Sequence, residues 1–441
     1  MGLFFWNDMC ARYYITLLFV FILLPVSADP SGGKVLVDSI VVSGNKTTDK
    51  GVILREMRHS EGEYFRPELL PYERDRIYSL GLFNRVEIHH TVNEGRATIF
   101  IDVHERWYIF PVPVFGMKDR DWNKLYYGLG VVHNNFRGRN QKLWLGFALG
   151  YDPWVSALYS NPSIFGRDDL FFETELVYTH TENRSIQYAE ELRDFSERRY
   201  IFNLTFGKRF SLFTTMTASL GYRSINTSEF IPGHIKTPDG SDNFMFGSLA
   251  FRYDTRDIIE YPMYGTFVRT AISKSGFGES HVDHFRTLVD VRRYVPLSDR
   301  LSIAGRLYTS VAGGTRLPHY SHMFIGYQEK IRGYYNDIFE GENLFLSSLE
   351  ARFRLLGPRY YEWENSLAPE FSILRYGINL AVFGDMGTTW YRDEAIKDLA
   401  PVKGFGAGVH LLLPYSGVLR FEYAMNESFD GQFIIDLFVM F

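Results

Sequence analysis

Leu143-Trp144-Leu145-Gly146-Phe147-Ala148-Leu149-Gly150 is the stretch that decides the fold of this chain. Large apolar side chains occupy its odd positions, and after Trp144 its even positions are small. Successive side chains of a strand point to opposite faces of a sheet, so this alternation predicts a strand whose two faces differ in character. The same period of two recurs over residues 200–207, 215–222, 285–295, 301–307 and 345–354.

Turn signals separate these stretches, and counting them gives about 16 predicted strands between residues 108 and 441. A soluble sandwich would produce the same alternation. Three features favour a membrane barrel instead: predicted strands of about 10–14 residues, charges on the inward face that suit a polar lumen, and an export signal. The composition agrees, with 17% aromatic residues, 38 Gly and 29 Tyr.

The export signal is the N-terminal segment. Arg12 precedes a short apolar run from Tyr13 to Val26, and small residues follow as far as Ala28. This pattern predicts a signal peptide at residues 1–28. The single cysteine, Cys10, lies within it, so the mature chain has no disulfide framework. A net charge of -5 argues against nucleic acid as a partner.

Residues 34–105 are predicted to form a small βααββ domain. Thr47 and Thr48 are predicted to cap a helix that runs through Met57, and Gly81 to end a second helix. A hairpin is expected around Asn93-Glu94-Gly95.

The longest departure from the strand pattern runs from Thr315 to Asn343. Loops longer than about 12–15 residues are uncommon and usually functional. We predict that this insertion folds back inside the barrel, where Asp385 holds Arg332. The alternation of side chains along this predicted strand supports contact between Arg332 and Asp385. Leu380 and Val382, at even positions, face lipid, so Phe383 and Asp385, at odd positions, face the lumen. A surface loop with a solvated arginine is the alternative.

The connections should alternate in length if the small domain lies on the periplasmic side. Extracellular connections are then often long and periplasmic ones short. The connection at 357–375 is predicted to break this rule, since it is long where a short one is expected.

The small domain resembles a POTRA domain through Ile40-Val41-Val42-Ser43-Gly44-Asn45 and Leu80-Gly81-Leu82-Phe83-Asn84-Arg85-Val86. The remainder resembles the BamA-type superfamily of outer-membrane assembly and translocation proteins. That resemblance rests on Ile331-Arg332-Gly333-Tyr334, Phe383-Gly384-Asp385-Met386-Gly387, Asp254-Thr255-Arg256-Asp257, the segment 404–421 and the terminal Phe441.

The resemblance implies a mainly β protein, a 16-stranded antiparallel transmembrane β-barrel over residues 108–441 preceded by one POTRA domain at 34–105. It implies a Gram-negative outer-membrane location with the POTRA domain in the periplasm. The implied loop-lock residues are Arg332, Gly333, Tyr334 and Asp385, with supporting lumenal residues Glu350, Arg352, Phe383 and Gly387.

The last strand alternates as well, with Phe433 and Phe441 on its apolar face. It is expected to lie in lipid and to serve as the insertion signal of the protein itself. The first strand contains Pro111 and Pro113, which lack a donor N–H. A weakly paired seam between the first and last strands is therefore expected.

The leading functional interpretation is an assembly factor that helps barrel proteins insert into the outer membrane. Its expected partners are unfolded outer-membrane clients, the lipid bilayer and periplasmic accessory proteins bound through the POTRA domain. Such work needs no nucleotide, metal or other cofactor, because strand pairing and apolar burial supply the free energy. The main alternative is a polypeptide secretion pore. A barrel enzyme is disfavoured because no nucleophile motif accompanies the Ser, His and Asp residues.

Overall fold

The computed structural model describes residues 35–117, 122–182, 195–277, 281–366, 372–395, 398–437 and 440. The signal peptide predicted at residues 1–28 and the terminal Phe441 lie outside this part of the chain. No helix within the described ranges combines the length and the apolar character needed to cross a membrane.

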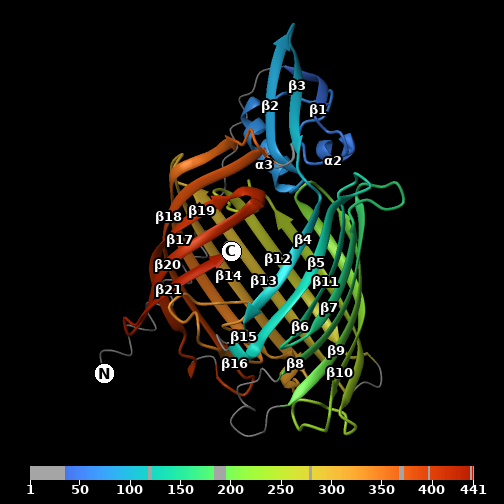
Figure 1. Cartoon of the computed structure of the whole chain (residues 1–441), viewed down its shortest axis with the longest axis vertical. Coiled ribbons are helices and arrows are strands. Elements are labelled where there is room, and N and C mark those ends of the chain that lie inside the picture. The colour runs from blue at the N-terminus through green and yellow to red at the C-terminus, as the bar shows by residue number, and fades with distance from the viewer. Residues whose placement is uncertain are drawn as a thin grey trace.

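The N-terminal domain is a three-stranded sheet covered by two helices. Its elements are β1 (Leu36–Ser43), α2 (Lys50–Leu54), the 3-10 turn η1 (Pro67–Leu69), α3 (Leu70–Ser79), β2 (Phe83–Asn93) and β3 (Arg96–Glu105). The central strand β3 pairs parallel with β1 and antiparallel with β2. Figure 1 shows this domain standing over one end of the large sheet.

The first helix of this domain is shorter than predicted. It ends at Leu54, and Asp49 rather than Thr47 or Thr48 caps it, by accepting a hydrogen bond of 2.8 Å from Gly51 N. The backbone N–H groups of Thr47 and Thr48 donate instead to the Glu105 carboxylate. The predicted cap failed because a tertiary acceptor satisfies these donors before the helix begins. The Gly81 helix end and the 93–95 turn agree with the prediction, with positive φ at Gly81, Glu94 and Gly95.

The rest of the chain forms one 16-stranded sheet in which each strand is antiparallel to its neighbour along the chain. Its strands are β4 (Ile109–Met117), β5 (Leu125–Phe136), β6 (Gln141–Gly150), β7 (Trp154–Asn161), β8 (Leu170–Glu182), β9 (Ser196–Arg209), β10 (Thr214–Thr227), β11 (Ser241–Asp254), β12 (Gly265–Ser275), β13 (His284–Pro296), β14 (Leu301–Gly314), β17 (Asn343–Glu362), β18 (Ile373–Trp390), β19 (Val402–Leu413), β20 (Gly417–Asn426) and β21 (Gly431–Leu437).

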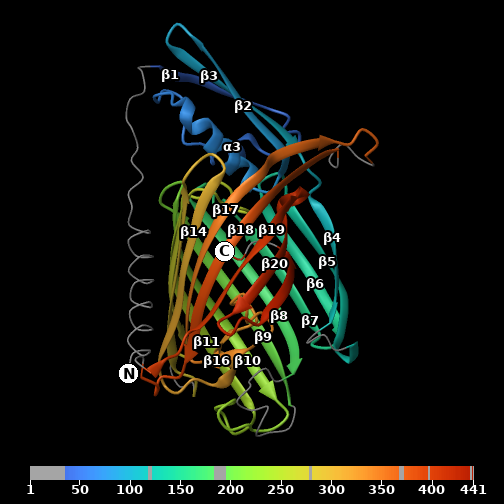
Figure 2. The ribbon, with the colours of Figure 1, turned by 90° about the vertical axis from the view of Figure 1, so that its left-hand side faces the viewer.

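The sheet curls into a barrel with tilted strands (Figures 1 and 2). The order of strands begins with β21 and ends with β4, and no register joins these two edge strands within the described residues. We call this gap the seam. At one end of the seam the Phe110 ring of β4 lies 5.7 Å from the ring of Tyr415, which belongs to the 3-10 turn η7 (Pro414–Ser416) between β19 and β20.

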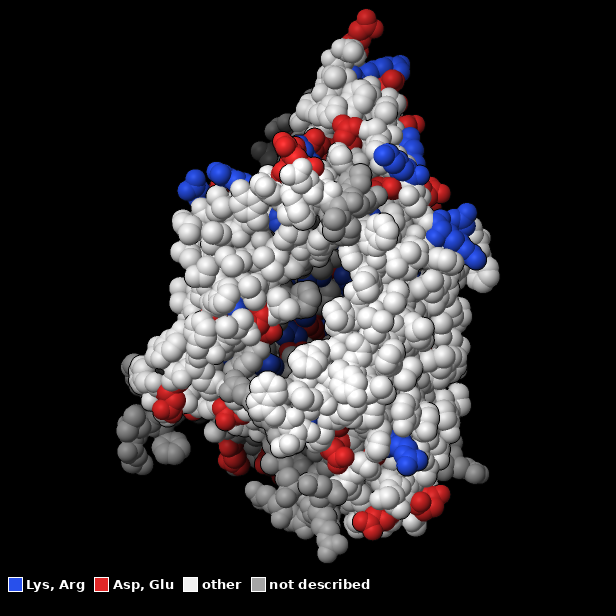
Figure 3. Space-filling view, in the orientation of Figure 1, with Lys and Arg blue, Asp and Glu red and all other residues white. Residues whose placement is uncertain are grey.

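The outer face of the sheet is apolar. Val382 is 64% exposed and Leu145 is 63% exposed on this face, while the alternate positions point inward. Figure 3 shows a largely uncharged wall, with a central hollow through which charged side chains of the interior are seen. The period of two thus separates an apolar exterior from a charged interior.

Both ends of the connection predicted at 357–375 are strand. β17 continues to Glu362 and β18 begins at Ile373, with register shifts around Leu356. β-bulges between Arg354 and Arg359 accommodate Gly357 and Pro358 without ending the ladder. The prediction of a long loop there was wrong, and the two strands instead form a ribbon that leaves the barrel (Figure 2).

Candidate functional site

The insertion between β14 and β17 lies inside the barrel. It contains the 3-10 turn η4 (His319–Ser321) and the short strands β15 (Met323–Ile325) and β16 (Phe339–Gly341), which pair with each other. Ile325 and Ile331 are fully buried and pack with Leu344 and Leu346 of β17 and with Tyr308 of β14. This small apolar core fixes the insertion against the inner wall of the sheet.

Arg332 stands at the centre of the candidate site and is 0% exposed. Its Nε donates to Asp385 Oδ2 at 2.7 Å and its Nη2 donates to Asp385 Oδ1 at 2.8 Å. This is the bidentate geometry in which a guanidinium and a carboxylate form strong, charge-assisted hydrogen bonds. The Arg332 backbone N–H adds a third bond to Asp385 Oδ2 at 3.1 Å.

Two further carboxylates complete the shell of Arg332. Its Nη1 donates to Glu350 Oε2 of β17 at 2.5 Å and to Glu422 Oε1 of β20 at 3.1 Å. The guanidinium carbon lies 3.5 Å from the centre of the Phe383 ring, so the cation also rests on an aromatic face. One loop residue thereby contacts β17, β18 and β20 simultaneously.

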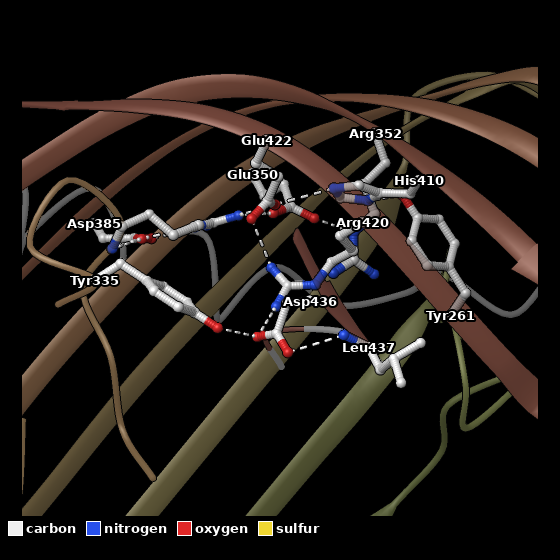
Figure 4. Close-up of polar contacts among 11 residues, drawn as sticks. Tyr261, Tyr335, Glu350, Arg352, Asp385, His410, Arg420, Glu422, Asp436 and Leu437 are labelled. Carbon is white, nitrogen blue, oxygen red and sulfur yellow. Dashed lines mark hydrogen bonds and ion pairs between the residues drawn. The ribbon is translucent and has the colours of Figure 1, made fainter. Parts of the chain in front are cut away.

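Further arginines surround these carboxylates (Figure 4). Arg352 Nε donates to Glu350 Oε1 at 2.8 Å, and Arg420 Nη1 donates to Glu422 Oε2 at 2.7 Å. Arg420 Nη2 reaches Asp436 Oδ2 on β21 at 2.9 Å. We call Arg332, Glu350, Arg352, Asp385, Arg420, Glu422 and Asp436 the lumenal cluster. Its three cations and four anions nearly balance, which offsets much of the cost of removing these charges from water.

Two tyrosines lie at the edges of the lumenal cluster. The Tyr335 hydroxyl donates to Asp436 Oδ2 at 2.7 Å and so ties the inserted loop to the last strand. The Tyr261 hydroxyl lies 3.0 Å from His410 Nδ1, and His410 Nε2 lies 3.1 Å from Glu422 Oε1. Tyr261 belongs to the connection between β11 and β12, so that connection also reaches the cluster.

The β11–β12 connection, residues 255–264, joins the lumenal cluster to the N-terminal domain. Ile258 packs in the hydrophobic core of that domain and is 7% exposed. Ile259 N donates to Ser79 Oγ of α3 at 3.2 Å. Further along the same connection, Pro262 O accepts from Arg352 Nη1 at 2.9 Å. One short segment therefore touches both the domain core and the cluster.

Glycines allow the inserted loop to approach the wall closely. Gly333 has φ +99°, which L side chains rarely adopt. A Cβ at Gly404 of β19 would lie 1.5 Å from Arg332 O, and one at Gly387 would lie 2.9 Å from Ile331 Cδ1. The absence of side chains at these positions admits the loop backbone.

The structure brings together most of the residues singled out from the sequence. Arg332, Asp385, Glu350 and Phe383 are in direct contact, and Arg352 touches Glu350. The Tyr334 hydroxyl instead lies 3.4 Å from Glu427 Oε1, which is outside the lumenal cluster. Phe433 is 64% exposed on the outer face and takes no part in the cluster.

Sequence reasoning missed Glu422 and Asp436 as members of the cluster. Both are acidic residues at inward positions of strands whose other face is apolar, with Phe421 and Ile435 as outward neighbours. A charged side chain at such a position requires a partner inside the barrel. That signal was available, but the period of two does not indicate which partner it meets.

Comparison with known proteins identifies the family of each part of the chain. The Omp85 superfamily domain model matches residues 135–433, and the POTRA model described as surface antigen variable number repeat matches residues 35–106. The outer membrane protein assembly factor BamA of Nitratidesulfovibrio vulgaris is 24% identical over 424 residues, which cover 90% of this chain and 50% of that protein. BamA of Neorickettsia risticii is 25% identical over 415 residues, covering 89% and 52%.

Two solved structures share the fold. BamA from Haemophilus ducreyi lacking POTRA domains 1-3 superposes with a TM-score of 0.53 at 17% identity, covering 92% of this chain and 84% of that chain. CdiB from Escherichia coli superposes with a TM-score of 0.56 at 11% identity, covering 94% and 92%. The chain spans about half the length of the curated relatives it matches.

The Omp85 model covers more than half of the 441 residues, and the POTRA model covers the domain before them. The chain therefore belongs to the Omp85 superfamily, and it is an outer-membrane protein whose POTRA domain lies in the periplasm.

Proposed function

We propose that this protein is an assembly factor that helps other β-barrel proteins fold into the outer membrane. Its own sheet would be a 16-stranded transmembrane barrel that closes weakly between β21 and β4. The observation that carries the proposal is the seam, the gap between the edge strands β21 and β4, which share no register within the described residues. Two curated relatives bear the name outer membrane protein assembly factor, which supports the same function.

The seam supplies a physical reason for client insertion. Unpaired backbone N–H and C=O groups are costly in hydrocarbon, so an edge strand in a bilayer favours pairing with an incoming strand. A client strand that pairs with β4 or β21 satisfies these groups and also buries its own apolar face in lipid. This pairing needs neither a nucleotide nor a metal, and it needs no catalytic residue.

Within this proposal the lumenal cluster has a bracing function. Arg332 would hold the insertion inside the barrel through Asp385, with Gly333 admitting the backbone and Tyr334 lying at the loop tip. Glu350, Arg352, Phe383 and Gly387 would support this lock. Phe433, together with Phe441, would belong to the strand that directs the insertion of this protein itself.

The remaining proposed partners follow from the same arrangement. Unfolded outer-membrane proteins would be the clients, and the POTRA domain would receive them or bind periplasmic accessory proteins. A polypeptide secretion pore is the alternative function. It requires a path through the lumen, which the insertion and the lumenal cluster occupy.

Sealing the seam tests the proposal. Cys10 is the only cysteine of the chain, so a Cys10→Ser chain can carry the pair Phe115→Cys and Ile435→Cys. These outward residues on β4 and β21 are 72% and 59% exposed. A bismaleimide would join the two strands, and a monofunctional maleimide on the same variant is the matched control.

The assay would follow the folding of a urea-unfolded barrel client into proteoliposomes that contain the labelled protein. We expect the control to accelerate client folding and the cross-linked protein to lose most of that acceleration. Equal acceleration by both forms would reject insertion through the seam. A secretion pore would instead continue to pass its substrate when the seam is sealed.

A further inference from the structure

The ribbon formed by the ends of β17 and β18 is the feature that the proposed function leaves unexplained. β17 has 20 residues and β18 has 18, whereas β14 has 14 and β19 has 12. Pairing with β14 ends at Phe353, and pairing with β19 ends at Gly377. Beyond these points β17 and β18 pair only with each other in the described residues, over 355–362 and 373–376. We call this segment the β17–β18 extension.

The register divides the extension into two faces. Tyr360 pairs with Arg375 and Glu362 pairs with Ile373, so these four residues share the inner face. Arg359 pairs with Tyr376, and Tyr361 pairs with Leu374, which places them on the outer face. Trp363 N donates to Ser372 O, which continues the same register, so the Trp363 side chain also belongs to the outer face.

The inner face of the extension is occupied by the POTRA domain. Arg85 of β2 donates to Glu362 at 3.0 Å, and its guanidinium lies 5.6 Å from the centre of the Tyr360 ring. The Arg375 guanidinium lies 4.6 Å from the centre of the Tyr78 ring of α3. The inner face therefore carries the periplasmic domain, and the outer face points away from it.

The outer face continues the lipid-facing surface of the barrel. Phe353 and Leu380 are a cross-strand pair on that surface and are 39% and 38% exposed. Leu355, two residues further toward the periplasm, is 54% exposed. Next come Tyr376 at 38%, Tyr361 at 57% and Trp363 at 41%. The surface thus changes from aliphatic to amphipathic aromatic with distance from the barrel, as membrane proteins do between the hydrocarbon core and the headgroups.

Charged residues are also distributed unequally between the two faces of the extension. Arg359 is the only charged residue at the outward positions of the extension, counted over its described residues, whereas Arg354, Glu362 and Arg375 share the inward parity. An arginine beside tyrosine and tryptophan can reach a lipid phosphate while its aliphatic stem remains on apolar surface. The register shifts around Leu356 bend the ribbon, and Figure 2 shows it running sideways from the barrel wall.

We propose that the outer face of the β17–β18 extension docks on the periplasmic leaflet of the outer membrane. Tyr361, Trp363 and Tyr376 would lie at the headgroup level, and Arg359 would bind a phospholipid phosphate. Because the inner face holds α3 and β2, this contact attaches the POTRA domain to the membrane surface. The occupant is a lipid surface, and the inference does not depend on which polypeptides the protein assembles.

Spin labels on single cysteines test the docking. In the Cys10→Ser chain, Tyr361→Cys reports the outer face and Glu362→Cys, its direct neighbour, reports the inner face. Leu380→Cys provides the bilayer reference, and Val92→Cys, on the POTRA hairpin and 46% exposed, provides the water reference. The full-length protein would be reconstituted in bilayers of phosphatidylethanolamine and phosphatidylglycerol, and collisions with oxygen and with a water-soluble nickel chelate would be measured.

We expect the label at position 361 to collide with the nickel chelate several-fold less often than the labels at 362 and 92, and to approach the oxygen accessibility found at 380. Adding Arg359→Glu should shift the label at 361 toward the aqueous values. A label at 361 as accessible to the chelate as the label at 92 would overturn the proposal. Shielding that appears only when an unfolded client is added would also overturn it, since the occupant would then be a polypeptide. Heat-modifiable migration of each variant verifies that its barrel is folded.

Discussion

Tyr261 and His410 are separated by 149 residues in the chain, yet the Tyr261 hydroxyl lies 3.0 Å from His410 Nδ1. His410 contacts Glu422, and Glu422 contacts Arg332 of the inserted loop. Three residues before Tyr261, Ile258 packs in the core of the POTRA domain. The covalent chain from Ile258 to Tyr261, followed by direct contacts from Tyr261 to Arg332, therefore links the periplasmic domain to the loop inside the barrel.

Truncation of Ile258 should weaken the attachment of the POTRA domain. Replacing a buried isoleucine by alanine costs about 2–5 kcal/mol, so Ile258→Ala should increase amide hydrogen exchange in α3. Ile259→Ala is the matched control, because the adjacent Ile259 side chain is 48% exposed. Equal exchange in the two variants would show that the connection does not hold the domain.

Arg332 and Asp385 should be strongly coupled in a double-mutant cycle. Removing one partner of a buried ion pair costs about 3–5 kcal/mol, because the other charge is left buried. We expect Arg332→Ala and Asp385→Ala to lower the free energy of unfolding in urea, and the double variant to lose much less than the sum. Arg316→Ala, at an exposed position of the same insertion, should change stability by less than about 0.5 kcal/mol. Additive effects at Arg332 and Asp385 would contradict the lock.

Two glycines on neighbouring strands should respond differently to alanine. A Cβ at Gly404 would collide with Arg332 O, whereas one at Gly384 meets nothing within 4 Å. Gly404→Ala should therefore displace the inserted loop and expose Lys330 and Arg332 to trypsin, while Gly384→Ala should leave them protected. The measurement is limited proteolysis of the folded protein followed by mass spectrometry. Cleavage at equal rates in the two variants would refute the close packing of loop and wall.

The periplasmic β11–β12 connection should respond to pH through Asp257. Burial raises the pKa of this carboxyl to about 7, although Met263 N and Tyr264 N donate to it. The carboxyl of an unfolded connection ionises near its ordinary value of about 4. Because the folded form keeps its proton over a wider range, the folded connection loses stability as pH rises from about 4 to 7 and changes little above that range.

Asp257→Asn should abolish this dependence, since the amide oxygen can still accept hydrogen bonds but does not titrate. Amide exchange of Met263 and Tyr264, corrected for intrinsic rates, measures the opening of the connection across this range. A pH slope that persists in the Asn variant would assign the effect to another group.

The strands and their parity could be predicted from the sequence because one physical rule governs them. The strands of the large sheet place alternate residues on its outer or its inner face, so Val382 and Asp385 could be assigned to opposite faces without knowledge of the structure. Because this alternation is a property of each strand by itself, the local sequence is sufficient to predict which residues share a face.

Contacts inside the lumen could not be predicted in this way. Glu422 meets Arg332 because the curvature of the sheet brings β20 across from the inserted loop, and no local pattern encodes that distance. The helix cap at Thr47 and Thr48 failed for a related reason, because Glu105, more than fifty residues away, takes their N–H groups. The extension of β17 past Gly357 and Pro358 depends on bulges in its pairing with β18, and the sequence of β17 alone does not specify that pairing.

The lumenal cluster also has a mechanical consequence. Its ionic contacts connect β17, β18 and β20 with Asp436 of β21. The strand at the C-terminal edge of the seam is therefore cross-linked to its neighbours and resists displacement. The opposite edge, β4, contains no charged side chain between Ile109 and Met117 and can form no such ionic cross-links. β4 is therefore easier to displace than β21. If the seam widens, β4 and its neighbours would move while β21 remains in place.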